Sequence, residues 1–189
     1  MAFIKHARNT QRQFGWTMII LHWFMALSII GLFGLGLYMV DLSYYDPFYT
    51  LGPKIHEALG IVITLMLLYR FYWKAVNPKP EPPATNSAVV NKASAAAHHL
   101  LYVLMVVVLV SGLFISFAGG EGINIFDLFV IPGPDSFFDN QAFLAGEVHF
   151  YVACGLMALV ALHALAALKH HYIDKDTTLS NMLGIKEKS

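Results

Sequence analysis

The sequence predicts an all-α membrane protein: a bundle of four transmembrane helices with both termini in the cytoplasm. Three observations lead to this fold class: a composition poor in charge, four apolar stretches of membrane-spanning length, and an uneven distribution of basic residues. Of the 189 residues, 57% are hydrophobic and only 13% are charged. Soluble domains carry about 25% charged residues, so this chain has too few charges to cover a water-facing surface.

The four apolar stretches are Thr17–Val40, His56–Trp73, His98–Ala118 and Val148–Leu168. Each is close to the roughly 20 residues that a helix needs to cross the hydrocarbon core. A β-barrel is disfavoured because the stretches lack the alternation of apolar and polar residues that barrel strands show. Lipid-exposed backbone must satisfy its own hydrogen bonds, which a helix does within one segment. We therefore expect four helices in a single domain over residues 1–189.

The basic residues predict the orientation of these helices. Of the twelve Lys and Arg residues, eleven fall on the side of the two termini, and Lys54 alone lies on the other side. Cytoplasmic loops carry the excess of Lys and Arg, so both termini should be cytoplasmic. The opposite side is acidic, and nothing in the chain suggests nucleic acid as a partner. Its acidic residues are Asp41, Asp46, Glu121, Asp127, Asp135, Asp139 and Glu147.

Four histidines, His22, His56, His149 and His163, lie inside the apolar stretches. Ionisable side chains are rare at membrane depth and tend to be functional there. His149 and His163 are fourteen residues apart in one stretch, which is almost four helical turns. Both imidazoles should therefore face nearly the same way, at depths roughly 21 Å apart along the axis.

The topology pairs these histidines by depth. The first helix runs outward and the fourth runs inward, so His22 and His163 both lie near the cytoplasmic side. The second and fourth helices begin on the periplasmic side, where His56 and His149 lie. Two independent pairs are thus consistent with one topology, and each pair could hold one ligand.

A haem fits two axial imidazoles, because its porphyrin supplies the other four iron ligands. A bare zinc ion would need three or four side chains, whereas each level offers two histidines, with Glu57 and Glu147 only at the rim. Packing or proton-relay histidines are the remaining alternative.

Haem propionates need cationic or hydrogen-bonding partners. Candidates are Arg70 and His98 at the cytoplasmic level and Lys54 at the periplasmic level. The alternatives are that Arg70 is an ordinary membrane anchor and that His98 packs against a ring edge rather than contacting a propionate or a quinone.

The loop from Gly119 to Gly146 contains Phe126, Phe129, Phe137 and Phe138. We predict either that it folds over the periplasmic end of the bundle or that its aromatic rings form an interfacial belt. The proline-rich segment 77–91 is predicted to be an extended connector.

Several stretches resemble the bacterial cytochrome b561 family, and the resemblance covers nearly the whole chain. It implies a four-helix protein of the bacterial inner membrane with two b-type haems, whose axial ligands would be the four histidines above. It also implies an electrical link between the periplasmic side and the quinone pool; some members oxidise superoxide and reduce ubiquinone. The stretches are Leu21-His22-Trp23, Lys54-Ile55-His56-Glu57-Ala58-Leu59-Gly60, Ala161-Leu162-His163-Ala164 and Leu168-Lys169-His170-His171-Tyr172-Ile173-Asp174-Lys175-Asp176.

The leading hypothesis is therefore a di-haem electron carrier that works with ubiquinone and an unknown periplasmic donor or acceptor, and that could be a superoxide oxidase. Against superoxide as substrate, the acidic outer side would repel an anion. The second hypothesis is a haem-bearing membrane anchor for a separate redox enzyme. The third is a transporter or proton channel with histidine relays, which would contain no visible-absorbing cofactor.

Overall fold

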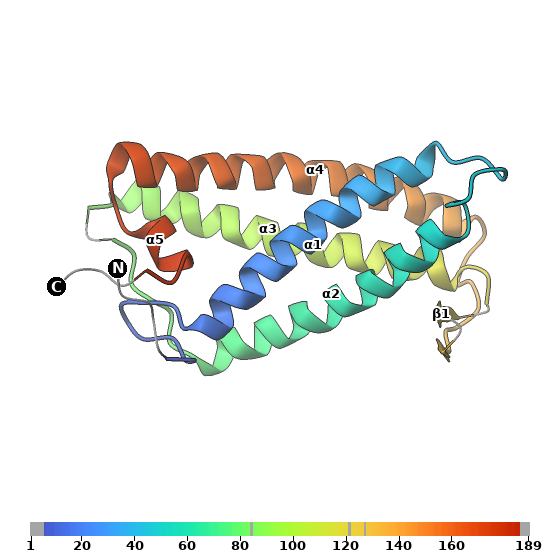
Figure 1. Ribbon diagram of the computed structural model, residues 1–189, viewed down its shortest axis with the longest axis horizontal. Helices are drawn as coiled ribbons and strands as arrows, with labels where there is room; N and C mark the ends of the chain where they lie inside the picture. Colours follow the sequence, from blue (N-terminus) through green and yellow to red (C-terminus); the bar gives the residue numbers. More distant parts are fainter. Residues whose placement is uncertain (1–5, 84, 121, 127, 186–189) are drawn as a thin grey trace. The chain divides into compact units, whose positions relative to one another are not determined.

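The computed structural model describes residues 6–83, 85–120, 122–126 and 128–185, and four long helices dominate it (Figure 1). These are α1 (Trp16–Val40), α2 (Leu51–Val76), α3 (Ala88–Phe117) and α4 (Gln141–Lys169). All four are long and apolar enough to cross a membrane. The predicted helical membrane fold is therefore confirmed.

All four helices begin earlier than the sequence predicts, α1 by a single residue and the other three by more than one turn. α2 begins at Leu51 instead of His56, α3 at Ala88 instead of His98, and α4 at Gln141 instead of Val148. Hydropathy marks only the part of a helix that matches the hydrocarbon core. Helical hydrogen bonding continues into the polar interface, where residues such as Asn91 and Lys92 are no obstacle.

Most apolar side chains on the helices face outward. In the apolar windows of the four helices, only 6% to 22% of residues are buried inside the protein. Leu27, Leu65 and Leu162 are more than 60% exposed. Apolar exposure on this scale would be unstable in water and is what a lipid-facing surface requires.

The chain forms two compact units, and each contains part of all four long helices. Unit 1 consists of Met1–Ala26, Met66–Leu100 and Ala158–Ser189, and unit 2 consists of Leu27–Leu65 and Leu101–Met157. Both ends of the described chain, His6 and Ile185, belong to unit 1.

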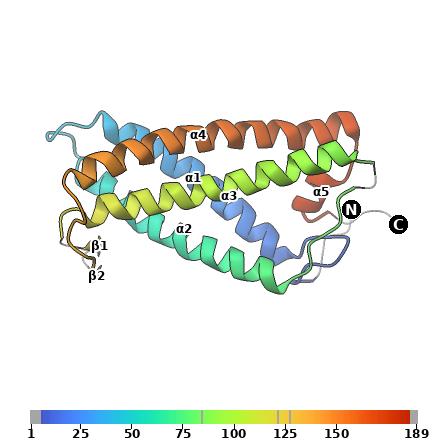
Figure 2. The same ribbon diagram turned by 180° about the vertical axis from the view of Figure 1, so that it is seen from behind.

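Unit 2 contains a short antiparallel hairpin that the sequence analysis did not predict (Figure 2). Strand β1 (Ile123–Ile125) pairs with β2 (Phe129–Ile131), with Ile123 opposite Ile131. Gly122 directly precedes β1 and has φ 76°. The Ile131 carbonyl of β2 lies so close to Gly122 that a Cβ there would overlap it. Strands of three residues are too short to show a period-two pattern, which explains why they were missed.

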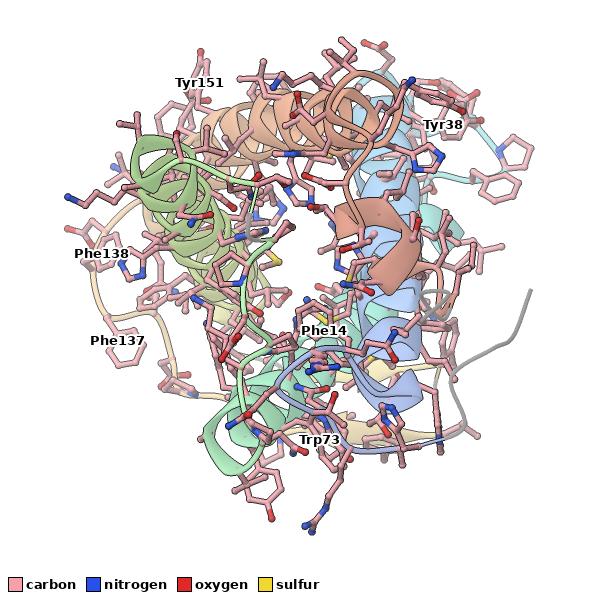
Figure 3. All side chains as sticks on the ribbon, turned by 90° about the vertical axis from the view of Figure 1, so that its left-hand side faces the viewer. Phe14, Tyr38, Trp73, Phe137, Phe138 and Tyr151 are labelled. Carbon is pink, nitrogen blue, oxygen red and sulfur yellow. The ribbon has the colours of Figure 1, made fainter. Side chains whose placement is uncertain are left out.

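The loop that holds this hairpin combines features of both predicted arrangements. Ile123 is only 1% exposed and contributes to the lining of a cavity in unit 2. The four phenylalanines are exposed, as an interfacial belt predicts, and Figure 3 shows Phe137 and Phe138 pointing outward. The loop therefore contacts the interior through an aliphatic side chain, while its aromatic rings stay outside.

Gln141, the first residue of α4, fastens this loop to α3. Its side chain is buried, and its Nε2 donates a hydrogen bond to the Phe114 carbonyl (2.8 Å). The Phe137 backbone N–H donates to Gln141 Oε1, also at 2.8 Å. One amide therefore satisfies two backbone groups, each of which would be costly to leave unpaired.

In unit 1, the N-terminal segment packs against the proline-rich connector. Asn9 is buried; its Nδ2 donates to the Pro78 carbonyl (3.2 Å) and its Oδ1 accepts from the Gly15 N–H (3.0 Å). The Glu81 N–H donates to the Gln11 carbonyl at 2.8 Å. Residues 78–83 form no helix or strand and are held by the N-terminal segment, whereas the last four residues of the predicted connector, 88–91, belong to α3.

The end of α4 is held by a cluster that we call the C-terminal clasp: His170, Asp174 and Asp176. α4 passes into a π-helical turn, η1 (His170–Asp174), and is followed by the short helix α5 (Thr178–Met182). His170 Nδ1 lies 2.6 Å from Asp176 Oδ2 and 3.2 Å from Asp174 Oδ2. The Asp176 side chain is 2% exposed. The clasp therefore folds the chain back after α4.

Some residues used to predict the orientation fall outside the described ranges. They are Lys5, Lys186 and Lys188 among the basic residues, and Glu121 and Asp127 among the acidic residues. The cytoplasmic location of both termini stays a prediction.

Replacing Gln141 with Ala should destabilise the protein, because it leaves the Phe114 carbonyl and the Phe137 N–H without their partner. Each unpaired buried group costs about 1–3 kcal/mol. The measurements are thermal unfolding of the detergent-purified protein and amide hydrogen exchange at Phe137. Gln11→Ala, at an exposed side chain, is the matched control. Equal unfolding temperatures for the two variants would contradict the role assigned to Gln141.

The clasp should open in acid. Burial alone would raise the pKa of Asp176, but hydrogen bonds from Thr178 and His170 outweigh it and hold this pKa below its usual value. A carboxyl group with a lowered folded pKa stabilises the structure above its unfolded pKa of roughly 4, and this contribution is lost as the pH falls through the folded value. Asp176→Asn should remove this acid transition.

The transition can be followed by Trp23 fluorescence in a Trp16→Phe/Trp73→Phe background, because Trp23 Nε1 donates to the Met182 carbonyl at 2.7 Å. Asp139→Asn, at an exposed carboxyl in unit 2, should leave the transition unchanged. An identical acid transition in the Asp176 variant would exclude Asp176 as its origin.

Candidate functional site

In unit 2, His56 from α2 and His149 from α4 face each other. Their ring centroids are 6.0 Å apart and their planes are inclined by 68°. This is one of the two pairs expected from the sequence.

The two rings border a cavity of about 470 Å³ with an overwhelmingly apolar wall. Two glycines border the imidazoles. A Cβ on Gly36 would lie 3.5 Å from His56 Cε1, and one on Gly112 would lie 3.3 Å from His149 Cε1. The contact at Gly112 is tighter than an ordinary van der Waals contact, whereas the contact at Gly36 is ordinary, so only a side chain larger than alanine would press on His56. All four long helices contribute to the wall, which also includes Phe33, Ile61, Leu109, Leu113, Phe150 and Met157.

The polar groups of this cavity are few and specific. His149 Nδ1 lies 2.9 Å from the Val108 carbonyl and 3.2 Å from Ser111 Oγ. Because a carbonyl can only accept, this geometry requires Nδ1–H and leaves the Nε2 lone pair for a ligand. His56 Nδ1 is buried and has no hydrogen-bond partner among the described residues.

A carboxyl group also borders the cavity. Glu57 forms part of the wall, and Ser116 Oγ donates to its Oε1 at 2.7 Å. Because α2 begins at Leu51 rather than His56, Glu57 is the seventh residue of the helix and not its second. Its place at the membrane rim stays a prediction.

In unit 1, His22 from α1 and His163 from α4 form the second pair. Their centroids are 6.3 Å apart and their planes are inclined by 70°. His98 from α3 lies beside His163, with centroids 5.2 Å apart. This is the ring-edge contact that the sequence analysis weighed for His98.

Arg70 reaches the same pair from α2. Its Nη2 lies 3.3 Å from His22 Nδ1. A guanidinium only donates, so His22 Nδ1 accepts here and Nε2 carries the proton. Metal binding through His22 Nε2 would therefore require the proton to move to Nδ1 and Arg70 to release the ring.

The spacing of both pairs fits one metal ion between two imidazoles. A metal lies about 2.0 Å from an imidazole nitrogen, and the ring centroid is about 1.1 Å beyond that nitrogen. Two imidazoles on opposite sides of one metal should therefore have centroids roughly 6 Å apart, which matches both pairs. The apolar cavity beside His56 and His149 suits a large flat macrocycle.

The bare-metal alternative gains no support at these pairs. Within the described ranges, the only group of three or more His, Cys, Asp or Glu residues with ligand atoms close enough for one ion is the C-terminal clasp. His98 does not complete such a group with His22 and His163. The side chains of the clasp already bind one another, and Lys169 Nζ lies 2.7 Å from Asp174 Oδ2, so these ligand atoms already have partners.

The three candidate propionate partners differ in how close they lie to the histidine pairs. Arg70 and His98 each contact a member of the His22–His163 pair. Lys54 does not form part of the described cavity wall. Sequence reasoning missed Ser111 and Gly112, although a serine and a glycine within an apolar helix are a signal of close packing.

The fold and the two pairs define a class: multi-pass membrane proteins with facing histidines in an apolar interior. Residues 13–184 match the family described as Prokaryotic cytochrome b561. The chain is 39% identical to Cytochrome b561 homolog 2 of Escherichia coli (strain K12), over 93% of this chain and 94% of that protein. It is 27% identical to the Probable superoxide oxidase CybB of Yersinia pestis, over 91% and 96% of the two chains.

The chain therefore belongs to the prokaryotic cytochrome b561 family. Membership makes it a multi-pass protein of the inner membrane that binds b-type haem and transfers electrons. The family resemblance recognised in the sequence is confirmed.

Gly112→Leu should reduce the haem that the purified protein retains. A Cβ at this position already meets His149 Nδ1 at 3.4 Å, so a larger side chain must displace the ring. Gly31→Leu is the control, because a Cβ on Gly31 meets no atom within 4 Å. The haem-to-protein ratio of the two variants gives the comparison, and equal ratios would show that Gly112 is not needed for space.

Proposed function

We propose that this protein transfers electrons across the inner membrane through two bis-histidine b-type haems and exchanges them with ubiquinone. His56 and His149 hold one haem, and His22 and His163 hold the other. The observation that carries the proposal is the centroid spacing of 6.0 and 6.3 Å in two separate pairs, each formed by two helices. A haem with both axial positions filled carries single electrons and offers no open position for dioxygen.

The residues around the ligands fix their orientation. The Val108 carbonyl accepts the Nδ1 proton of His149 and so directs Nε2 towards the cavity. Such hydrogen bonds set the tautomer and raise the basicity of a ligand. Gly36 and Gly112 leave the imidazoles room, and the apolar wall excludes water from the ligand atoms.

Arg70 is the propionate partner at the His22–His163 pair. Loading this pair requires His22 Nδ1 to gain a proton, and the guanidinium can then no longer donate to it. The released Arg70 turns to a carboxylate, for which its planar donors are well suited. His98, beside His163, is the second polar group at this level, and Lys54 is the propionate partner at the other.

The acidic outer side makes superoxide a poor substrate for this chain. With the proposed orientation, Asp41, Asp46, Asp135 and Asp139 lie on the periplasmic side, and their field slows the approach of an anion. The relative named as a probable superoxide oxidase supports testing this activity. A cationic or neutral periplasmic donor or acceptor suits this surface better.

A membrane anchor for a separate redox enzyme is the second candidate. The exposed phenylalanines of the hairpin loop favour it, because they offer an apolar surface beside acidic residues. An anchor would keep both haems but show no turnover with soluble donors and ubiquinone.

The deciding measurement is a reduced-minus-oxidised visible spectrum of the detergent-purified protein, combined with a pyridine haemochrome count. Two b-type haems per chain are expected. His149→Ala and His163→Ala should each lower the count, because each removes one axial ligand; His171→Ala, in the π-helical turn that follows the same helix, is the control. Two haems in both ligand variants would refute the assignment.

A further inference from the structure

The two histidine pairs carry opposite electrostatic surroundings. Beside the His22–His163 pair lies the guanidinium of Arg70, with Nη2 3.3 Å from His22 Nδ1. Arginine stays charged under all ordinary conditions. This pair therefore has a permanent positive charge close by, and the charge stays at this level when Arg70 leaves His22 for a propionate, as proposed above.

Beside the His56–His149 pair lie acceptors. Glu57 lines the cavity with its carboxyl group, and the Val108 carbonyl accepts from His149 Nδ1 at 2.9 Å. Ser116, the donor to Glu57, shares the same wall. In the part of the chain that the structure describes, no Lys or Arg lines this cavity.

These surroundings act on the oxidation state of an iron between the rings. Reduction removes one positive charge from the iron, so a nearby cation favours the reduced state and a nearby carboxylate favours the oxidised state. A hydrogen bond from imidazole Nδ1–H to a carbonyl makes the ligand more basic, which also favours the oxidised state. Inside a cavity with a dry, apolar wall, these electrostatic effects on the iron are stronger than in water.

We propose that Arg70 and Glu57 set the direction of electron transfer: the His56–His149 site has the lower reduction potential and the His22–His163 site the higher. The inference rests on the two-haem function proposed above. With a haem held at each pair, the ferrous iron at His56–His149 would give one electron to the ferric iron at His22–His163, with no proton transferred. In the orientation that the basic residues predict, this flow runs from the periplasmic side to the cytoplasmic side.

A potentiometric titration of the haem absorbance tests the assignment. The wild-type protein should titrate as two components of unequal potential. Arg70→Gln should move the higher component down, and Glu57→Gln should move the lower component up. Each removes one charge near one site, so the affected reduction equilibrium constant should change roughly tenfold, which is about 59 mV for one electron.

Matched variants separate local charge from general effects. Arg70→Lys keeps the charge and should restore most of the higher potential. Lys92→Gln and Asp139→Asn remove exposed charges from unit 1 and unit 2 and should leave both components in place. Ser111→Ala, which removes a hydroxyl 3.2 Å from His149 Nδ1, should move only the lower component.

The haem count distinguishes failure of this inference from failure of the proposed function. Fewer than two haems in the wild-type protein would refute the function itself. Two haems with the opposite assignment, in which Arg70→Gln moves the lower component or Glu57→Gln the higher, would overturn only the inference. Two haems that neither variant shifts would overturn it as well. If Arg70→Gln loses haem, the Glu57→Gln titration still decides.

Discussion

The separation of two imidazoles by about 6 Å, each from a different helix, is the constraint on which the rest of this structure depends. That distance allows one metal ion between the rings and leaves little tolerance, because metal–nitrogen bonds vary by only about 0.2 Å. The helices must therefore approach closely where the ligands stand and separate enough to leave a cavity beside them. Gly36 and Gly112 satisfy the first requirement, and the long aliphatic and aromatic side chains of the wall satisfy the second.

A second constraint comes from the hydrocarbon surroundings, where no water can satisfy a stray polar group. Ser116 donates a hydrogen bond to Glu57, and the Val108 carbonyl accepts one from His149. Each of these contacts removes a polar cost and at the same time fixes the position of a helix or a ligand. Polar residues in this interior are few, and they hold the geometry that the apolar residues, being non-directional, cannot specify.

The sequence was sufficient for the helices and for the pairing of the histidines, because both follow from one-dimensional regularities. Apolar length gives the membrane spans, and the alternating direction of four helices gives the depth of His22, His56, His149 and His163. The approach of α3 to α4 follows from no such regularity, so the contacts of Ser111 and Val108 with His149 were missed. The starts of α2, α3 and α4 were misplaced for a related reason: a hydropathy window cannot locate a helix start in the polar interface.

The C-terminal segment of unit 1 joins the two helices that carry its histidine pair. His170 follows His163 by seven residues and is the first residue after α4. The clasp turns the chain back to Met182, whose carbonyl accepts a hydrogen bond from Trp23, the neighbour of His22. The path from His163 through the clasp to Trp23 and His22 thus returns to His163. The contacts that close it are made by residues that are synthesised after both histidines. The His22–His163 pair is consequently completed late in biosynthesis. His22 enters the membrane with the first helix, but the contacts that hold His163 opposite it form only when residues 176–182 have left the ribosome.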